Sequence, residues 1–303
     1  MELEFIRWLE KRLPRSTASP PGIGDDAALF ALEAGHQGVV TVDVLTDGVD
    51  FELAEVPPRR IGRKALAVNL SDLAAMAARP LAAVVGVALP RAGALELVKE
   101  LYEGLIPLAE QYDVVIAGGD TNTWDGRLVI SVTVIGQVSV GRALTRAGAS
   151  RGDSILVTGQ LGGSILGHHL DFEPRIEAAL WLAEHGKVKA GMDISDGLSL
   201  DLWRMTKAGG LGAELMASKI PIAAAAAELA RADGRPALEH ALSDGEDFEL
   251  LLAAEPGVAT ELEVTQPLQC GLTVIGRFVA EPGLWLLDDD GKRTPIEPQG
   301  FQH

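Results

Sequence analysis

Short β-branched runs alternate with helical segments along the whole chain, and this alternation constrains the fold more than any other feature. Before residue 140, strands are predicted at 38–45, 82–89, 114–118 and 127–138. Apolar residues at helical spacing predict helices at 2–13, 57–78 and 94–112. Strands and helices that interleave in this way bury their apolar surfaces as helices packed on sheets. The sequence therefore predicts an α/β or α+β fold.

One break interrupts the pattern, at the segment RAGASRGD (146–153), which is rich in small residues and bounded by charges. After it, the runs SILVTG, KAGMDIS and FELLLAA are predicted strands, and helices are predicted within 163–185 and from Leu198. A chain of 303 residues fits two domains of roughly 150 residues each. We predict an N-terminal domain at 1–146 and a C-terminal α/β domain at 147–303.

The charge balance narrows the possible partners. Asp and Glu number 43 against 26 Lys and Arg, which gives a net charge of −17. Nucleic acids and anionic membranes both select basic surfaces, so neither is an expected partner. The N-terminus is charged throughout and resembles no signal peptide, and the single Cys270 excludes an intramolecular disulfide. We expect a cytoplasmic protein.

Part of the acidic excess falls in five short segments, several of which lie beside glycines at the ends of predicted elements. These segments hold seven aspartates: Asp25, Asp26, Asp43, Asp72, Asp120, Asp193 and Asp196. Each alone has an ordinary explanation as a turn, a helix cap, a strand edge or a solvated helix face. Together they predict one cleft lined by carboxylates. Oxygen ligands without His or Cys favour Mg²⁺, and such sites mostly handle polyphosphates.

Other phosphate-handling motifs are missing. The chain has no GxxxxGK[ST] and no protein-kinase motif set. The glycine-rich segment 159–167 is open to two readings, a backbone cradle for a phosphate or a turn before a helix. Glu246 and Asp247 stand in a further acidic turn, LSDGEDFELL, just before a predicted strand.

Taken in order, the motifs resemble the thiamine-monophosphate kinase family, in the superfamily of aminoimidazole ribonucleotide synthetase. The strings that carry the resemblance are GIGDDAA, VDVLTDGVDF, KALAVNLSDLAAMAA, AGGDT, GRALTRAGA, MDISDGL, DGEDFELL and GFQH. The resemblance implies an N-terminal domain that dimerises into a shared β-barrel and a C-terminal α/β domain that completes a nucleotide and substrate cleft. The implied cofactors are ATP and several Mg²⁺ ions, and the implied assembly is a homodimer.

The resemblance also assigns residues by motif position. It implies the metal ligands Asp26, Thr41, Val42 (through its backbone carbonyl), Asp43, Asp72, Asp120, Asp193 and Asp196. It implies the ATP contacts Tyr102, Gly119, Asp120, Arg146 and Ser195, and the substrate contacts Asp50, Glu246 and Phe301. Asp43, Asp72, Asp120 and Arg146 are the implied catalytic residues. The implied reaction is direct in-line transfer from ATP to thiamine monophosphate, whose ionised phosphate oxygen needs no general base.

Three departures from the family pattern all fall on the substrate side. Asp50 stands where the family has a histidine, Gly163 replaces an aspartate in a Gly-Asp-Ser string, and HLDFEPR (169–175) keeps Arg175 but has lost one basic residue. Two alternatives therefore stay open: a related ATP-dependent enzyme with another small acceptor, and a non-catalytic nucleotide-binding relative.

Overall fold

The computed structural model describes residues 2–13, 30–185 and 188–301, and within them the chain forms two compact units. The first comprises residues up to Leu73 together with Ala78–Gly141, and the second comprises Ala74–Ala77 together with the residues from Arg142 onward. The structure thus confirms a two-domain fold of mixed α and β content. The division that we predicted after residue 146 lies close to the Gly141–Arg142 junction.

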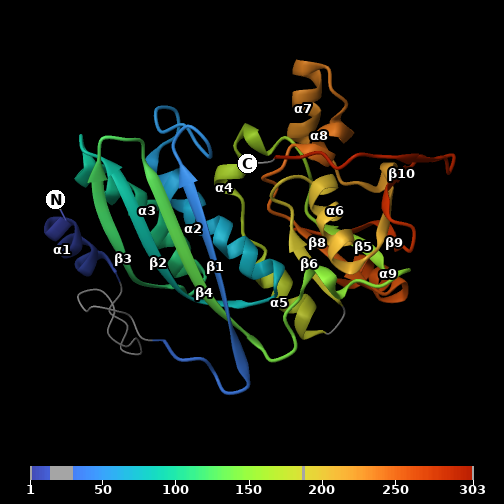
Figure 1. The fold of residues 1–303 in the computed structure, drawn as a ribbon, viewed down its shortest axis with the longest axis horizontal. Helices are drawn as coiled ribbons and strands as arrows, with labels where there is room; N and C mark the ends of the chain where they lie inside the picture. The colour runs from blue at the N-terminus through green and yellow to red at the C-terminus, as the bar shows by residue number, and fades with distance from the viewer. Residues whose placement is uncertain (1, 14–29, 186–187, 302–303) are drawn as a thin grey trace. The chain divides into compact units, whose positions relative to one another are not determined.

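In the first unit, four strands form one sheet in the order β1-β4-β2-β3 within the described residues, and helices α2 and α3 lie on one of its faces (Figure 1). The elements are α1 (Glu2–Arg12), β1 (His36–Thr46), α2 (Pro58–Ala75), β2 (Arg79–Pro90), α3 (Ala94–Gln111), β3 (Val115–Trp124) and β4 (Val129–Ser139). Only β2 and β3 run parallel. The helix predicted at 57–78 ends at Ala75 because Ala77 takes a left-handed φ of 53°, which an α-helix cannot continue through.

Two glycines allow α2 and α3 to touch backbone to backbone. A Cβ built on Gly62 would overlap the carbonyl oxygen of Leu101, and one built on Gly104 would overlap that of Arg59. Around this contact the helices bury Leu66, Leu70, Leu105 and similar residues completely. The glycines therefore fix how closely the two helices approach, and with it the position of α2.

The second unit contains a mixed sheet whose described strands follow the order β11-β10-β7-β9-β5-β8-β6. Its strands are β5 (Ser154–Thr158), β6 (Ala190–Asp193), β7 (Gly212–Met216), β8 (Leu250–Ala254), β9 (Leu272–Val279), β10 (Gly283–Leu287) and β11 (Arg293–Pro295). Its helices are η1 (Arg146–Gly148), η2 (Ser164–Leu166), α4 (His168–Asp171), α5 (Ile176–Glu184), α6 (Leu198–Gly209), η3 (Ala217–Lys219), α7 (Ala224–Asp233), α8 (Ala237–Ser243) and α9 (Pro256–Thr265).

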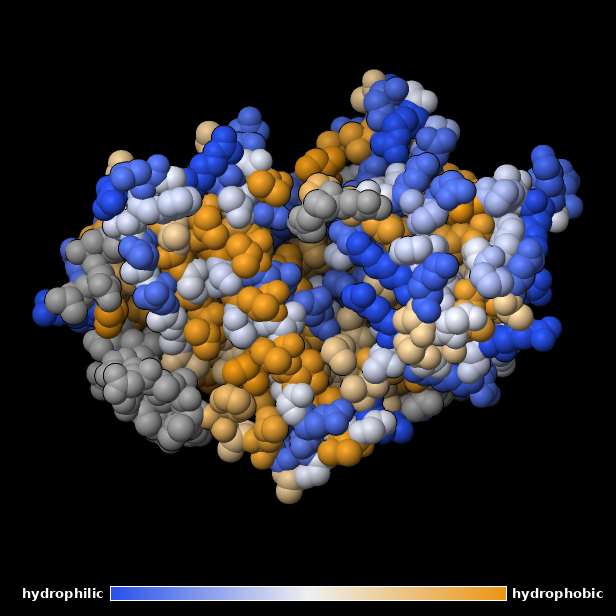
Figure 2. Space-filling view, in the orientation of Figure 1, coloured by the Kyte–Doolittle hydropathy of each residue, from blue (hydrophilic) through white to orange (hydrophobic). Residues whose placement is uncertain are grey.

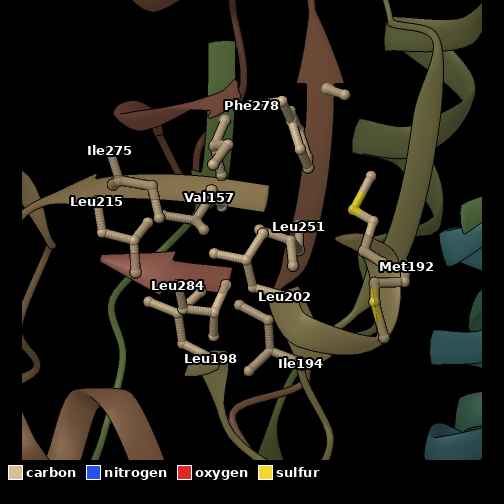
Figure 3. Packing of buried hydrophobic residues seen from close by; sticks show 14 of the residues in the cluster. Val157, Met192, Ile194, Leu198, Leu202, Leu215, Leu251, Ile275, Phe278 and Leu284 are labelled. Carbon is tan, nitrogen blue, oxygen red and sulfur yellow. The ribbon is translucent and has the colours of Figure 1, made fainter. Parts of the chain in front are cut away.

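The core of the second unit lies where α6 packs on this sheet. Figure 3 shows Leu198 and Leu202 of the helix meeting Val157, Leu251 and Leu284 from three strands. Every residue of β5 and β8 is buried, which explains why β8 (LLLAA) and the centre of β5 (Ile155–Val157) are continuous apolar runs rather than alternating ones. Burying each such side chain stabilises the fold by roughly 1.5–3 kcal/mol.

Two predictions of secondary structure need correction. The strand predicted to begin at Phe248 begins at Leu250, because Glu246 and Phe248 adopt left-handed φ values of 53° and 50°. The elements α7, α8, α9 and β9–β11 were not predicted. Separately, no helix in the described part of the chain is both long and apolar enough to cross a membrane.

Candidate functional site

In the first unit, β1 and α2 bring together Thr41, Asp43 and Asp72. Along β1 the side chains alternate, so Val40, Val42 and Val44 are more than half exposed while Thr41 and Asp43 are partly covered. The hydroxyl of Thr41 donates a hydrogen bond to Oδ2 of Asp72. The side chain of Val42 points away from this group, to the other face of the sheet.

Electrostatics marks this group as a place for a cation. Burial is the largest of three causes that together raise the pKa of Asp43 to about 7, and the other two are the negative charges of Asp72 and Asp50. Carboxylates this close to one another are unfavourable when ionised unless a positive charge joins them. The donors are carboxylate and hydroxyl oxygens, which suit a hard divalent cation.

The donor set fits Mg²⁺ without forming a complete cage. In the described ranges, no three His, Cys, Asp or Glu side chains gather closely enough to hold a metal ion. Mg²⁺ normally keeps several waters and uses one or two carboxylates plus substrate phosphates, so the pair Asp43 and Asp72 is sufficient protein ligation. Asp25 and Asp26 lie outside the described residues.

Asp50 lies in the turn that follows β1, near this group. Its Oδ2 accepts the backbone N–H of Thr46 at 2.7 Å, and its carbonyl accepts a hydrogen bond from Nζ of Lys64 at 2.9 Å. Lys64 is buried in α2 at 1% exposure, and the sequence did not predict it as a residue of the candidate site. Its position beside apolar residues of a helix gave no sign of this contact with the Asp50 turn.

The structure does not bring Asp120 to Asp43 within the chain. Both residues lie on edge strands, Asp43 on β1 and Asp120 on β3, with β4 and β2 between them. Three strand spacings separate them, roughly 14 Å along the sheet. Gly119 and Asp120 pair with Val85 and Gly86, and a Cβ on Gly119 would overlap the carbonyl oxygen of Val85. Glycine is therefore required at 119 for strand pairing alone.

Tyr102 does not support its predicted role in nucleotide binding. It is 2% exposed on α3, and its ring packs edge-on against Phe5 at a centroid distance of 5.1 Å. Burial raises the pKa of its phenol. In this structure Tyr102 is a core residue of the first unit.

In the second unit, the segment after β6 presents Asp193, Ser195 and Asp196. Asp193 ends the strand and is 5% exposed, while Asp196 forms an ion pair with Nη1 of Arg204. The same Nη1 donates to Oδ1 of Asp201 at 2.8 Å, and Asp201 is fully buried.

Asp201 closes the loop at the start of α6. Its Oδ2 accepts the N–H groups of Asp196 at 2.9 Å and Gly197 at 3.1 Å. Burial raises its pKa to about 6, against the lowering effect of those hydrogen bonds and of Arg204. Asp201 and Arg204 were not predicted, although their i,i+3 spacing on a helix is the signal of a pair.

Three separate segments, those that carry Ser195, Glu246 and Phe301, converge in this half of the chain. The N–H of Glu246 donates to the carbonyl of Ser195 at 2.7 Å, and the N–H of Phe301 donates to the carbonyl of Asp196 at 3.0 Å. The Phe301 ring is half exposed. Arg146 is exposed in η1, which packs beside α6 and β6.

The glycine-rich segment is not a free phosphate cradle. The N–H of Gly162 donates to Oδ1 of Asp247 at 2.8 Å, and the N–H of Gly163 donates to Oδ2 of Asp244 at 3.1 Å. Both donors are used within the chain, so the hypothesis of phosphate binding by these amides is wrong. Gly163 has a φ of 76°, and a Cβ there would collide with the backbone of Ala225 and Ala226, which explains a glycine at this position.

Arg175, the basic residue kept from the family's substrate segment, is bound to Glu249. Its Nε donates to Oε2 at 2.7 Å and its Nη2 pairs with Oε1. Glu249 is 2% exposed and also accepts from the hydroxyl of Thr158 at 2.6 Å. This buried pair joins β8, β5 and the segment before α5.

Both units match known proteins. Residues 24–138 match the N-terminal domain of AIR synthase related proteins, and residues 143–288 match their C-terminal domain. The chain is 44% identical over 310 residues to the thiamine-monophosphate kinase of Rhodopirellula baltica, covering all of this chain and 97% of that protein.

Solved structures give the same result. The crystal structure of thiamine-monophosphate kinase from Stenotrophomonas maltophilia K279a has a TM-score of 0.81 and 34% identity, with 96% of each chain covered. A structure of AaThiL complexed with AMPPCP and TMP has a TM-score of 0.75 and 30% identity, covering 100% of this chain and 96% of that one.

Proposed function

Since this chain belongs to the thiamine-monophosphate kinases, within the AIR synthase related family, we infer that it transfers the γ-phosphoryl group of ATP to thiamine monophosphate. The products are ADP and thiamine diphosphate. The observation that carries this inference is the 44% identity to such a kinase along the whole chain. A binding-only relative would not need the paired carboxylates that burial and mutual repulsion make costly in β1 and α2.

In the first unit, the proposed Mg²⁺ ligands are Thr41, Asp43 and Asp72. In the second unit, the proposed Mg²⁺ ligands are Asp193 and Asp196. Asp120, Asp26 and the Val42 carbonyl complete the proposal from family position. When bound, Mg²⁺ neutralises charge on the polyphosphate and so favours transfer of the phosphoryl group.

The remaining contacts follow the same assignment, without Tyr102. We assign ATP binding to Gly119, Asp120, Arg146 and Ser195, and acceptor binding to Asp50, Glu246 and Phe301. Arg146 supplies positive charge to the phosphates.

The acceptor oxygen is already ionised near neutral pH, so the chain has only to position it. The histidines described near the Ser195 segment are consistent with this, because His168 bonds to the carbonyl of Asp247 and His169 to that of Ser164.

The exposed sheet face supports a homodimer. Helices cover one face of the first unit's sheet, and the other face carries the exposed residues Val40, Val42, Val44 and Val84. Figure 2 shows hydrophobic side chains, in orange, gathered over this sheet. The strand register places Val42 and Val84 in one row through Thr133. We propose that a second copy covers this face, with the two sheets closing a barrel.

Sedimentation should find a dimer, and Val42→Asp with Val44→Asp should yield a monomer. An unchanged dimer in that variant would contradict the proposal. We further propose that the enzyme works in the cytoplasm.

The activity test uses purified, nucleotide-free protein with ATP, MgCl₂ and thiamine monophosphate. Thiamine diphosphate should accumulate in equal amount to ADP, and neither should form when the acceptor is omitted. Asp43→Asn is the matched variant and should reduce turnover at least 100-fold, in the range of losses for removing one transition-state charge contact. If the wild-type protein forms no thiamine diphosphate at any acceptor concentration, the proposed function is wrong.

A further inference from the structure

Asp247 is a buried carboxyl group that the assignments above do not use. It lies between Glu246 and Phe248 in the turn before β8 and is 2% exposed. Its Oδ1 accepts the N–H of Gly162 at 2.8 Å, and its buried Oδ2 has no hydrogen-bond partner among the described residues. A buried oxygen atom without a hydrogen bond lowers the stability of the folded protein, so the presence of an aspartate at this position needs a reason.

The turn around Asp247, residues 244–248, is fixed on two sides. On one side, the N–H groups of Glu246 and Phe248 donate to the carbonyls of Ser195 at 2.7 Å and Ile194 at 2.8 Å. These bonds tie the turn to the segment that carries the proposed metal and nucleotide contacts.

On the other side lies the glycine turn, residues 162–164. Besides the bond from Gly162 to Asp247, the N–H of Gly163 donates to Asp244, and the hydroxyl of Ser164 donates to the carbonyl of Gly245 at 2.6 Å. Gly245 and Asp247 flank Glu246, and both accept a hydrogen bond from the glycine turn; of these two residues, only Asp247 accepts through its side chain.

The backbone conformation of residues 246–248 depends on contacts with the surrounding chain. Glu246 and Phe248 both have left-handed φ values, which cost an ordinary L-residue about 1 kcal/mol or more and persist only where surrounding contacts impose them. The residue between them carries two of those contacts, the bond to Gly162 and the bond from Nε2 of His168 to its carbonyl at 3.1 Å.

The surroundings favour the uncharged form of this group. Burial raises the pKa of Asp247 well above its usual range, the Gly162 N–H opposes that rise, and the charges of Glu249 and Asp244 add to it. A neutral carboxyl group has one acceptor oxygen and one O–H, which is the pattern of a side-chain amide.

We propose that Asp247 is a positioning residue that fastens the turn 244–248 to the glycine turn through its hydrogen bond to Gly162, and that it thereby sets Glu246 against the thiamine part of the acceptor. The role is one of shape and hydrogen bonding and requires no negative charge. It rests on the proposed function, because Glu246 is an acceptor contact only if the acceptor is thiamine monophosphate.

Three variants test the proposal: Asp247→Asn, Asp247→Ala and the control Asp153→Ala. Asparagine keeps an acceptor for Gly162 and places an N–H₂ group where the acid has its O–H, so both KM values should stay within about twofold of wild type. Alanine removes the fastening, so KM for thiamine monophosphate should rise about tenfold or more while KM for ATP changes less than about twofold.

Asp153 is a matched control for simple loss of stability. It is 3% exposed in the same unit and accepts a backbone N–H, that of Ser150 at 2.8 Å, but it lies outside the turn. Asp153→Ala should lower the melting temperature without moving KM for either substrate. Calorimetric titration with thiamine monophosphate should show the same loss of affinity in Asp247→Ala as the KM does.

An unchanged acceptor KM in a folded Asp247→Ala protein would overturn the proposal. So would a tenfold rise in Asp247→Asn, because that result would show that the charge is required, and this second criterion holds even if the alanine variant does not fold. A wild-type protein that forms no thiamine diphosphate refutes the proposed function instead, so the two failures are distinguishable.

Discussion

The raised pKa of Asp43 predicts that the protein without divalent cations loses stability as the pH rises. The folded-state pKa is about 7, above the unfolded value of 3.8, so the folded state holds this proton more tightly than the unfolded state does. The contribution of Asp43 to the free energy of unfolding therefore falls between pH 4 and pH 7. Above pH 7 this contribution no longer changes with pH.

The substitution Asp43→Asn removes this titration and keeps the shape of the side chain. Between pH 5 and pH 7 the difference amounts to two pH units at about 1.4 kcal/mol each, so at most about 3 kcal/mol. Because Asp43 is only partly covered, we expect about 1–2 kcal/mol after solvent screening. Wild type should thus lose about 1–2 kcal/mol more than the variant over this range.

Urea unfolding at pH 5, 6, 7 and 8 in the presence of a chelator measures the effect. Adding MgCl₂ at pH 8 should restore stability to the wild type and have a smaller effect on Asp43→Asn, because one cation ligand is lost. Parallel pH profiles for the two proteins in chelator would refute the reasoning, since they would show that Asp43 does not titrate in this range.

Three substitutions test the packing and the ion pairs. Gly104→Ala should lower the free energy of unfolding in urea by about 2–4 kcal/mol, because the new Cβ overlaps the carbonyl of Arg59. The control Gly257→Ala in α9 meets nothing within 4 Å and should raise the free energy of unfolding by up to about 0.5 kcal/mol. Equal effects of the two substitutions would contradict this account of the α2–α3 contact. Arg204→Gln leaves Asp201 buried without its cation and should lower the free energy of unfolding by about 2–3 kcal/mol. Adding Asp201→Asn should recover part of that loss. Purely additive effects would show that the two residues are not coupled. Gly163→Asp, the change toward the family residue, should cost more than about 2 kcal/mol by thermal melting, and a stability equal to wild type would show that the glycine turn can rearrange.

The strands and long helices of the first unit could be predicted because their patterns are local. β1 is a β-branched run and α3 has apolar residues at helical spacing, so each element is specified by its own residues. The end of α2 and the start of β8 were less accurate. Both depend on left-handed residues, Ala77, Glu246 and Phe248, which are not glycines and give no signal in the sequence.

The candidate site shows the same limit. Motif position singled out Thr41, Asp43, Asp72, Ser195 and Glu246, and within each unit the structure brings together Thr41 with Asp72 and Ser195 with Glu246. It could not show that the amides of Gly162 and Gly163 are already used, because their partners lie 81 or more residues further along the chain. Tyr102 was misassigned because an aromatic residue in a buried helix and one in a nucleotide site look alike in sequence.

The four residues Ala74–Ala77 have a consequence for attempts to study the two units apart. They are the last two residues of α2, the helix that carries Asp72, and the two residues after it. They nevertheless belong to the second unit, where the carbonyl of Met76 accepts the N–H of Leu144 at 3.2 Å and the carbonyl of Ala75 lies against Gly191. A single cut after Gly141 would therefore release a C-terminal fragment that lacks part of its own packing. The two halves should therefore be expressed together as one chain. A chimera with a relative would have to take residues 74–77 from the same parent as the C-terminal half.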